Sequence, residues 1–371
     1  MKEIDLVYRT MFAELGQRTL DANFKTDFPI EGRFVSVTVK ANDYWYFDTP
    51  TQHGDKRTYV GPKSDEDISK RVTAFKEIKD DLRARRKLVS TLKRDAGMIS
   101  PERFTGDIIE ALADAGLFRL RSVLIGTVAF QTYSGVLGVK MPLAFTQTGD
   151  VDFAQFHSIS AAVNDTIPPI LDTLHRVDRT FRELPHPGGN LTPQFENAKR
   201  YKVEFLTPNT SRDDYANRPV RMPALGGAAA EPMRFLDYLI HEPIRTVLLH
   251  KSGISVNVPA PERYAIHKLI VASRRRRDDN GISKRDKDAQ QAAQLCEALI
   301  TTRRQSDLAL AFAEAWNRGA AWQQGITIGW SFVSSKKRNE IFAGLAEGMN
   351  DIGENLVDYG LDFRAPEPGS S

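Results

Sequence analysis

The alternation of apolar and polar residues predicts a helix and then a small sheet in the first 60 residues. Apolar side chains recur at helical spacing over residues 4–20, which predicts an amphipathic helix. Residues 33–40 alternate with period two and an aromatic run follows at 44–47, so we expect a β-hairpin with a third short strand at 57–60. A long charged helix is then expected over residues 64–94.

A short apolar strand that breaks at a glycine is expected in the middle of the chain. It follows a helix that Ser100 caps and Gly116 ends, since serine accepts hydrogen bonds from free helical N–H groups. The apolar stretch 119–125 predicts a buried strand that ends at Gly126-Thr127, where another helix begins. Four more strands are expected, at residues 147–156, 201–207, 245–250 and 254–258.

The second half of the chain changes from strands to helices. Residues 209–231 lack periodicity and contain consecutive glycines, which predicts a loop. Helices are expected at residues 263–277 and 284–303 and in further segments to about residue 357. The Pro- and Ser-rich residues 364–371 are expected to be disordered. The pattern predicts an α+β fold with a small central sheet and a helical C-terminal half.

Composition adds limits on domain number, partners and location. The 371 residues are enough for two or three domains. A formal charge of +3 imposes no general attraction to nucleic acid, although the basic residues are locally clustered. Cys296 is the only cysteine, which excludes an intrachain disulfide and favours a reducing compartment. The N-terminus lacks the apolar core of a secretory signal and no run approaches the roughly 18 apolar residues of a membrane span, so a cytoplasmic location is expected.

Asp150-Val151-Asp152 is the leading candidate for chemistry. In a strand these two aspartates share one face, roughly 6.5–7 Å apart at the backbone. Their carboxylates can converge on divalent cations, which phosphoryl transfer requires. An exposed strand face, or one loop aspartate with one ion-paired partner, is the alternative explanation.

Two further positions support the same chemistry. At Gly126-Thr127 the glycine allows close approach to a ligand and the helix start offers N–H groups to a phosphate, although Thr127 could simply cap the helix. Glu204 is a candidate third carboxylate if its strand lies beside that of the two aspartates. A solvent-facing charge paired with Lys202 or a loop arginine is the alternative.

The basic residues of the second half include one that should be buried. Lys268 lies in an apolar helix and needs an anionic partner, which a nucleoside triphosphate would provide. His267 beside it is assigned no role. A helix would spread the arginines at 274–277 around its circumference, so at least one would face inward or toward a ligand. Asp288 could pair with Lys284 one turn earlier.

Four features follow one another in an order that resembles the nucleotidyltransferase fold of the DNA polymerase beta superfamily: the Gly126-Thr127 turn, the Asp150-Val151-Asp152 strand, the Glu204 strand and the Lys268 helix. Residues 261–272, followed by basic residues and Lys287-Asp288, are similar to bacterial nucleotidyltransferases of the abortive-infection toxin type. The resemblance covers about residues 119–296. Gly-Thr stands here where Gly-Ser or Gly-Gly is common, and Glu204 stands where aspartate is more usual.

The resemblance implies a division of the chain and a role for each matched residue. It implies a nucleotidyltransferase core with a small mixed sheet flanked by helices at 99–259, an N-terminal helix, hairpin and basic helix at 1–98, a helical domain at 260–360 and a tail at 361–371. It implies that Asp150, Asp152 and Glu204 bind Mg²⁺ or Mn²⁺ and act in catalysis, and that Gly126, Thr127, Lys268 and Asp288 bind the nucleotide.

The implied reaction moves a nucleoside monophosphate from an NTP to a hydroxyl acceptor, for which RNA or tRNA is the first expectation. The basic helix at 83–94 and the arginines at 274–277 could contact phosphates, and the aromatic run 44–47 could stack on bases. The aromatic run is expected, more simply, to form the core of its own hairpin. Transfer to a protein or a small molecule, and a non-catalytic protein that binds nucleotide or nucleic acid, are the alternatives.

Overall fold

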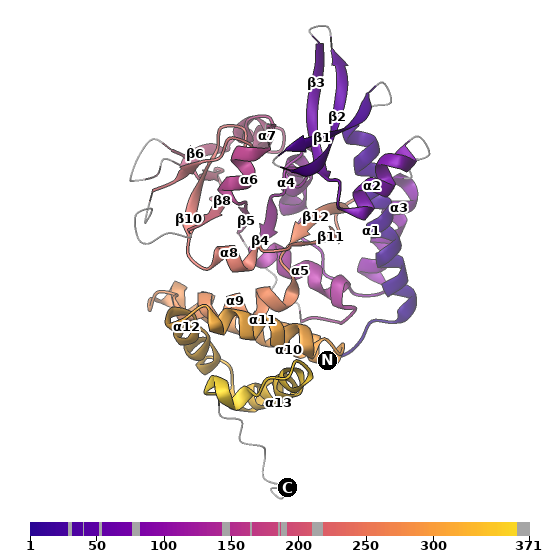
Figure 1. Cartoon of the computed structure of the whole chain (residues 1–371). Coiled ribbons are helices and arrows are strands. Elements are labelled where there is room, and N and C mark those ends of the chain that lie inside the picture. The colour runs from indigo at the N-terminus through magenta and orange to yellow at the C-terminus, as the bar shows by residue number, and fades with distance from the viewer. Residues whose placement is uncertain are drawn as a thin grey trace, which may run out of the picture. The chain divides into compact units, whose positions relative to one another are not determined.

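A computed structural model of the chain describes residues 1–28, 32–39, 41–51, 54–75, 82–142, 149–163, 165–184, 186, 191–209 and 218–361 (Figure 1). The chain divides into two units. Unit 1 comprises Met1–Glu3, Val136–Gln147 and Pro259–Ser371, and unit 2 comprises Ile4–Gly135 and Thr148–Val258. No helix among the described residues combines the length and apolar character that a bilayer crossing requires.

A mixed sheet forms the centre of unit 2. Its main path runs in the order β4 (Val123–Ile125), β5 (Asp150–Ala154), β8 (Lys202–Pro208), β10 (Ala229–Met233) and β9 (Val220–Arg221), with β6 (Arg182–Leu184) and β7 (Gln194–Glu196) beside it. Strand β5 is antiparallel to β4 and parallel to β8, and β8 is also parallel to β10. The expected α+β fold with a small mixed sheet is confirmed.

The two neighbouring strands β5 and β8 are held by aromatic packing on one face. Val151, Phe153, Val203 and Phe205 alternate with less buried residues and are themselves almost fully buried. The rings of Phe153 and Phe205 stack with centroids 5.6 Å apart. This apolar face fixes the register, because a shift of one residue would expose every one of these side chains.

Helices and a second hairpin complete this part of unit 2. The helices are α4 (Arg103–Asp114), α5 (Gly126–Leu137, which continues into unit 1), α6 (His157–Ala162), α7 (Ile170–His175) and α8 (Leu236–Leu239), and the hairpin is β11 (Ile244–Leu248) with β12 (Ile254–Val258). Helix α4 buries Ile108, Ile109 and Leu112 and packs against α7 and β12. The buried face of α4 is therefore part of the core beside the sheet.

The N-terminal elements also belong to unit 2. They are α1 (Leu6–Asp27), β1 (Arg33–Val39), β2 (Asn42–Thr51), β3 (Gly54–Pro62), α2 (Glu66–Ala74) and α3 (Leu82–Arg94), and the three strands form an antiparallel sheet. Leu15 of α1 and Leu92 of α3 share one apolar cluster with Val247 and Leu249. The N-terminal helices are thus packed on the β11–β12 hairpin.

The aromatic run of the hairpin faces its own core. Phe47 is completely buried and contacts Phe28, Phe34 and Phe75 through tilted or edge-on rings. The indole N–H of the half-buried Trp45 donates to Ser69. The simpler explanation of the aromatic run, a core of its own, is the one that the structure shows.

Unit 1 is helical. Its helices are α9 (Pro261–Ser273), α10 (Asp279–Thr301), α11 (Gln305–Asn317), α12 (Ala320–Ser331), α13 (Ser335–Asp351) and the 3-10 helix η4 (Leu356–Tyr359). Helix α9 packs against α10, α11 and α12, with Gly329 of α12 pressed against the backbone of Leu269. Cys296 is fully buried in α10, and burial raises the pKa of its thiol to about 12.

Several expected elements differ in extent from the structure. Helix α4 begins at Arg103 with Glu102 in the cap position, so Ser100 is not the cap. The expected loop at 209–231 contains β9 and the first residues of β10. Strand β10 was not predicted because it contains alanine and proline, which are both poor strand formers. The expected strand at 119–125 is strand only from Val123, since turns occupy the preceding residues.

The segment that carries the arginines also differs. Helix α9 ends at Ser273, so the arginines at 274–277 do not continue it as expected. Helix α10 then starts after Asp278, whose side chain accepts a hydrogen bond from the N–H of Gly281. The interior of the expected charged helix (76–81) and the tail 364–371 lie outside the described residues.

Candidate functional site

The register of two parallel strands brings three carboxylates together on one face. Asp152 of β5 lies opposite Glu204 of β8, and Asp150 lies opposite Lys202. These four side chains are partly exposed, while the residues between them are buried. The strand pairing therefore presents the expected carboxylate pair and the third carboxylate to the same partly solvated side of the sheet.

Gly126 forms a bend directly beside this face. It has a φ of +68° and begins helix α5, immediately after Ile125, which pairs with Asp152. A Cβ atom at Gly126 would lie 2.5 Å from Oδ2 of Asp152, so only glycine lets the carboxylate lie this close to the bend. Thr127 follows, half-buried, in the first turn of the helix, where backbone N–H groups lack helical partners.

Tyr201 also belongs to this region, and sequence reasoning did not identify it. Its hydroxyl donates to Oγ1 of Thr105 on α4 at 2.9 Å. Burial raises the pKa of Tyr201, and the negative charges of Asp150 and Asp152 raise it further. The neutral phenol therefore lies within electrostatic reach of the carboxylate pair.

The donor set of this face suits a hard divalent cation. Carboxylate oxygens are the ligands that Mg²⁺ and Mn²⁺ take in proteins, and Asp150, Asp152 and Glu204 are half-buried and not enclosed. The adjacent start of α5 adds backbone donors and the positive end of a helix dipole, which favour a phosphate. The residues present therefore fit a metal-bound phosphate.

In unit 1, Lys268 and Asp288 form one buried cluster with Arg275. The Nζ atom of Lys268 donates to Oδ1 of Asp288 at 2.6 Å, and Nε of Arg275 donates to Oδ2 at 2.7 Å. Burial raises the pKa of Asp288, but the charges of Lys268 and Arg275 outweigh it and hold that pKa below its ordinary value. Asp288 thus pairs with these two cations and not with Lys284, and it provides the anionic partner that the burial of Lys268 demands.

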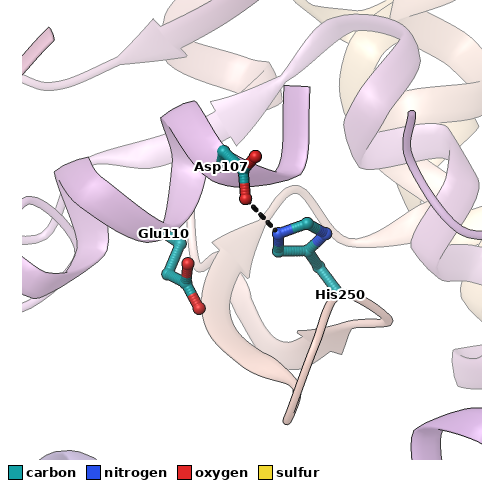
Figure 2. Close-up of side chains that lie close together, drawn as sticks. All are labelled: Asp107, Glu110 and His250. Carbon is teal, nitrogen blue, oxygen red and sulfur yellow. Dashed lines mark hydrogen bonds and ion pairs between the residues drawn. The ribbon is translucent and has the colours of Figure 1, made fainter. Parts of the chain in front are cut away.

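A second group of possible metal ligands joins α4 to the turn between β11 and β12 (Figure 2). Asp107, Glu110 and His250 bring one ligand atom each to within 4.8 Å of one another, and Nε2 of His250 donates to Oδ1 of Asp107 at 3.0 Å. Lys251 forms ion pairs with both carboxylates, at 2.7 Å to Asp107. Its ammonium group offsets part of the negative charge of the two carboxylates, and these ion pairs fasten α4 to the β11–β12 turn. Only the three-residue spacing of Asp107 and Glu110 on a helix could have indicated it from sequence.

A cavity of about 600 Å³ lies elsewhere in unit 2, lined among others by Phe118, Arg121, Arg245 and Asn257. It adjoins the residues that precede β4, whereas Gly126 follows the other end of that strand. The cavity is therefore separate from the bend that contacts Asp152.

A mixed sheet that gathers carboxylates beside a helix start is an arrangement that suits metal-dependent phosphoryl transfer. Residues 103–317, more than half of the chain, match the model of a protein family described as Nucleotidyltransferase. The chain belongs to this family and is a nucleotidyltransferase enzyme. The matched stretch runs from the first residue of α4 to the last residue of α11 and contains every residue predicted for the site. No curated protein and no solved structure matches the chain.

Proposed function

We propose that this nucleotidyltransferase transfers a nucleoside monophosphate from an NTP to a hydroxyl group, and that Asp150, Asp152 and Glu204 hold the divalent cation. The observation that carries the proposal is the close approach of the Asp152 carboxylate to the Gly126 bend, where a Cβ atom would have no room, with Glu204 next to Asp152 in register. A bound Mg²⁺ or Mn²⁺ would offset the charge of the phosphates. The assignment to the DNA polymerase beta superfamily, and to its toxin-type members, is part of this proposal.

In the proposed reaction the acceptor oxygen attacks the α-phosphorus. The new P–O bond forms as the bond between the α-phosphorus and the bridging oxygen breaks, and pyrophosphate leaves with that electron pair. Glu204 accepts the proton of the acceptor hydroxyl. The N–H groups at Gly126 and Thr127 position the phosphates. Lys268 and Asp288 are assigned to the nucleotide.

We assign RNA or tRNA as the first acceptor, with a protein or small-molecule hydroxyl as the second. The support is helix α3, on which Arg86, Lys87, Lys93 and Arg94 are exposed to solvent. Such a row of cations contacts a phosphate backbone without regard to sequence. The aromatic run of the hairpin offers fewer rings for base stacking than its sequence indicated, because Phe47 lies in an apolar cluster and Trp45 packs against that cluster.

The catalytic proposal is tested by pyrophosphate release from each NTP with Mg²⁺, in the wild type, Asp152→Asn and Asp172→Asn. Asp172 is an exposed aspartate on α7 and serves as the matched control. Loss of a metal ligand should lower turnover by about 100-fold or more, and chelation of the metal should abolish it. Unchanged turnover in Asp152→Asn, or NTP binding without pyrophosphate release in the wild type, would contradict the proposal.

The acceptor is identified by transfer of α-labelled NTP into a cell lysate. Label that ribonuclease removes and protease does not supports an RNA acceptor. Label that survives ribonuclease but not protease shows a protein acceptor. A labelled product that passes through a small-pore filter and separates chromatographically from the NTP and its hydrolysis products shows a small-molecule acceptor.

A further inference from the structure

We infer that Gln194 of β7 binds the acceptor, and that its carboxamide selects an acceptor with a second hydroxyl group next to the attacking one. The inference rests on the proposed function, because it places the acceptor beside Glu204. It extends that function to a chemical class of acceptor, a vicinal diol, and to a residue that sequence reasoning did not identify.

Gln194 lies in the same row of paired residues across the sheet as two of the carboxylates. Strand β8 pairs with β5 on one side and with the antiparallel strand β7 on the other, so Glu204 lies between Asp152 and Gln194. Paired residues point to the same face of a sheet, and across antiparallel strands their Cβ atoms are about 4.5–5.5 Å apart. The carboxamide therefore flanks Glu204 on the side opposite to Asp152 and the Gly126 bend.

The buried face of the β7–β8 hairpin fixes this position. Phe195 follows Gln194 on the opposite face, is only 2% exposed and meets Phe205 edge-on with ring centroids 6.1 Å apart. In the turn of the hairpin, Oδ1 of Asn197 accepts a hydrogen bond from the N–H group of Tyr201 at 2.9 Å. A slip of β7 by one residue would expose Phe195, so Gln194 is held on the face of the carboxylates.

The two rows of this face differ in charge. One row alternates in sign across β5, β8, β7 and β6, through Asp150, Lys202, Glu196 and Arg182. The row of Asp152 and Glu204 continues instead with the neutral Gln194 and then the apolar Leu184. A phosphate group beside Gln194 would be repelled by the neighbouring carboxylate of Glu204, whereas a neutral hydroxyl group would not. The row therefore favours a neutral polar group of the acceptor at this point.

The carboxamide of Gln194 is available to a ligand. Gln194 is half-buried, and its side chain has no hydrogen-bond partner among the residues that the structure describes. Neither polar atom of the amide is closed off from solvent. A carboxamide offers an N–H donor and an oxygen acceptor, and a hydroxyl group offers the same pair. While the attacking hydroxyl group gives its proton to Glu204, the amide can hold the neighbouring one.

The test compares Gln194→Met with Gln324→Met. Methionine keeps the length of the side chain and removes both polar groups, and Gln324 is an exposed glutamine of unit 1 that serves as the matched control. Transfer of α-labelled NTP is measured against increasing amounts of a nucleotide-free cell lysate as the source of acceptors. Gln194→Met should raise the KM for the lysate acceptor about tenfold or more, because two hydrogen bonds are lost. Gln324→Met should transfer label as the wild type does.

Nucleotide binding separates acceptor recognition from a purely structural role. Calorimetry without lysate measures the affinity for Mg²⁺ and a non-hydrolysable analogue of the NTP that the wild type turns over fastest. Gln194→Met should bind this analogue as the wild type does, because Gln194 lies on the far side of Glu204 from the bend. Analogue binding that weakens in parallel with transfer overturns the inference, and so does equal transfer by Gln194→Met and the wild type.

The chemical class of the acceptor is tested with periodate, which cleaves vicinal diols. Wild-type transfer should fall about tenfold in a lysate that has been oxidised with periodate, reduced with borohydride and quenched before NTP is added. Gln194→Met should transfer equally little label into treated and untreated lysate, because both changes remove the same interaction. Undiminished wild-type transfer into treated lysate overturns the diol. Ribonuclease then distinguishes a diol at the end of an RNA strand from a diol on the sugar of a small molecule.

Failure of this inference and failure of the proposed function give different results. A wild type that transfers label no better than Gln194→Met leaves the transfer reaction in place and removes only the role of Gln194. A wild type that neither releases pyrophosphate nor transfers label contradicts the proposed function, and the inference falls with it.

Discussion

Gly126 is subject to two separate constraints, its positive φ and the Asp152 carboxylate beside it. Gly97 has the same φ of +68° but no atom within 4 Å of its Cβ position. Both Gly126→Ala and Gly97→Ala should lose about 1 kcal/mol of stability from the backbone alone. Gly126→Ala should lose more, and should also lose transfer activity, because Asp152 must move. Urea denaturation and pyrophosphate release check this, and equal behaviour of the two variants would refute the role of the contact.

Asp288 should also make stability depend on pH. Since its neighbouring cations hold its pKa below the ordinary value, the folded state binds the proton less readily than the unfolded state. Its contribution is therefore complete above the unfolded pKa of about 4 and is lost as pH falls through the lower folded pKa. Asp288→Asn should cost on the order of 3 kcal/mol at pH 7, because it leaves two cations without a charged partner.

The measurement is urea denaturation of the wild type and Asp288→Asn between pH 7 and pH 3. The gap between them should narrow as the pH falls below about 4. A gap that stays constant over this range would show that the Asp288 charge does not stabilise the folded state.

At the level of elements, β5 and β8 depend on the aromatic pair behind the carboxylates. Phe205→Ala removes the ring stacked on Phe153 and should cost about 3–5 kcal/mol, with loss of transfer activity. Phe332→Ala, at a half-buried position in unit 1, is the control and should cost less. Retained activity and stability in Phe205→Ala would mean that the register of β5 and β8 does not depend on this packing.

The sequence predicted β5 and β8 because apolar and polar residues alternate with period two in both strands. It also predicted the carboxylate pair and the glycine bend, which are local features. It did not reveal the partners of Asp288, because Lys268 and Arg275 lie 20 and 13 residues away and meet it only after α9 and α10 pack. Tyr201 and the Asp107 cluster were missed for the same reason. The end of α9 was missed because arginine is a good helix former and gives no local stop signal.

At the level of the whole molecule, the residues that match the family model are fewer than the residues that build the apolar core around them. The match starts at residue 103, yet Leu15 and Leu92 share an apolar cluster with Val247 and Leu249 of the matched region. A fragment of residues 103–361 would expose this cluster and should not fold cooperatively. Circular dichroism melting checks this, with the fragment 1–361 as the control. A cooperative transition in the shorter fragment would show that the N-terminal helices are dispensable for folding.

The single cysteine has a practical consequence. Cys296 is fully enclosed, and the high pKa of its thiol keeps it protonated at neutral pH. New cysteines at exposed positions, such as Lys93 in unit 2 and Lys336 in unit 1, can therefore carry a pair of fluorescent dyes without replacement of the native residue. Energy transfer between the dyes would then record any movement of the two units as substrate is added.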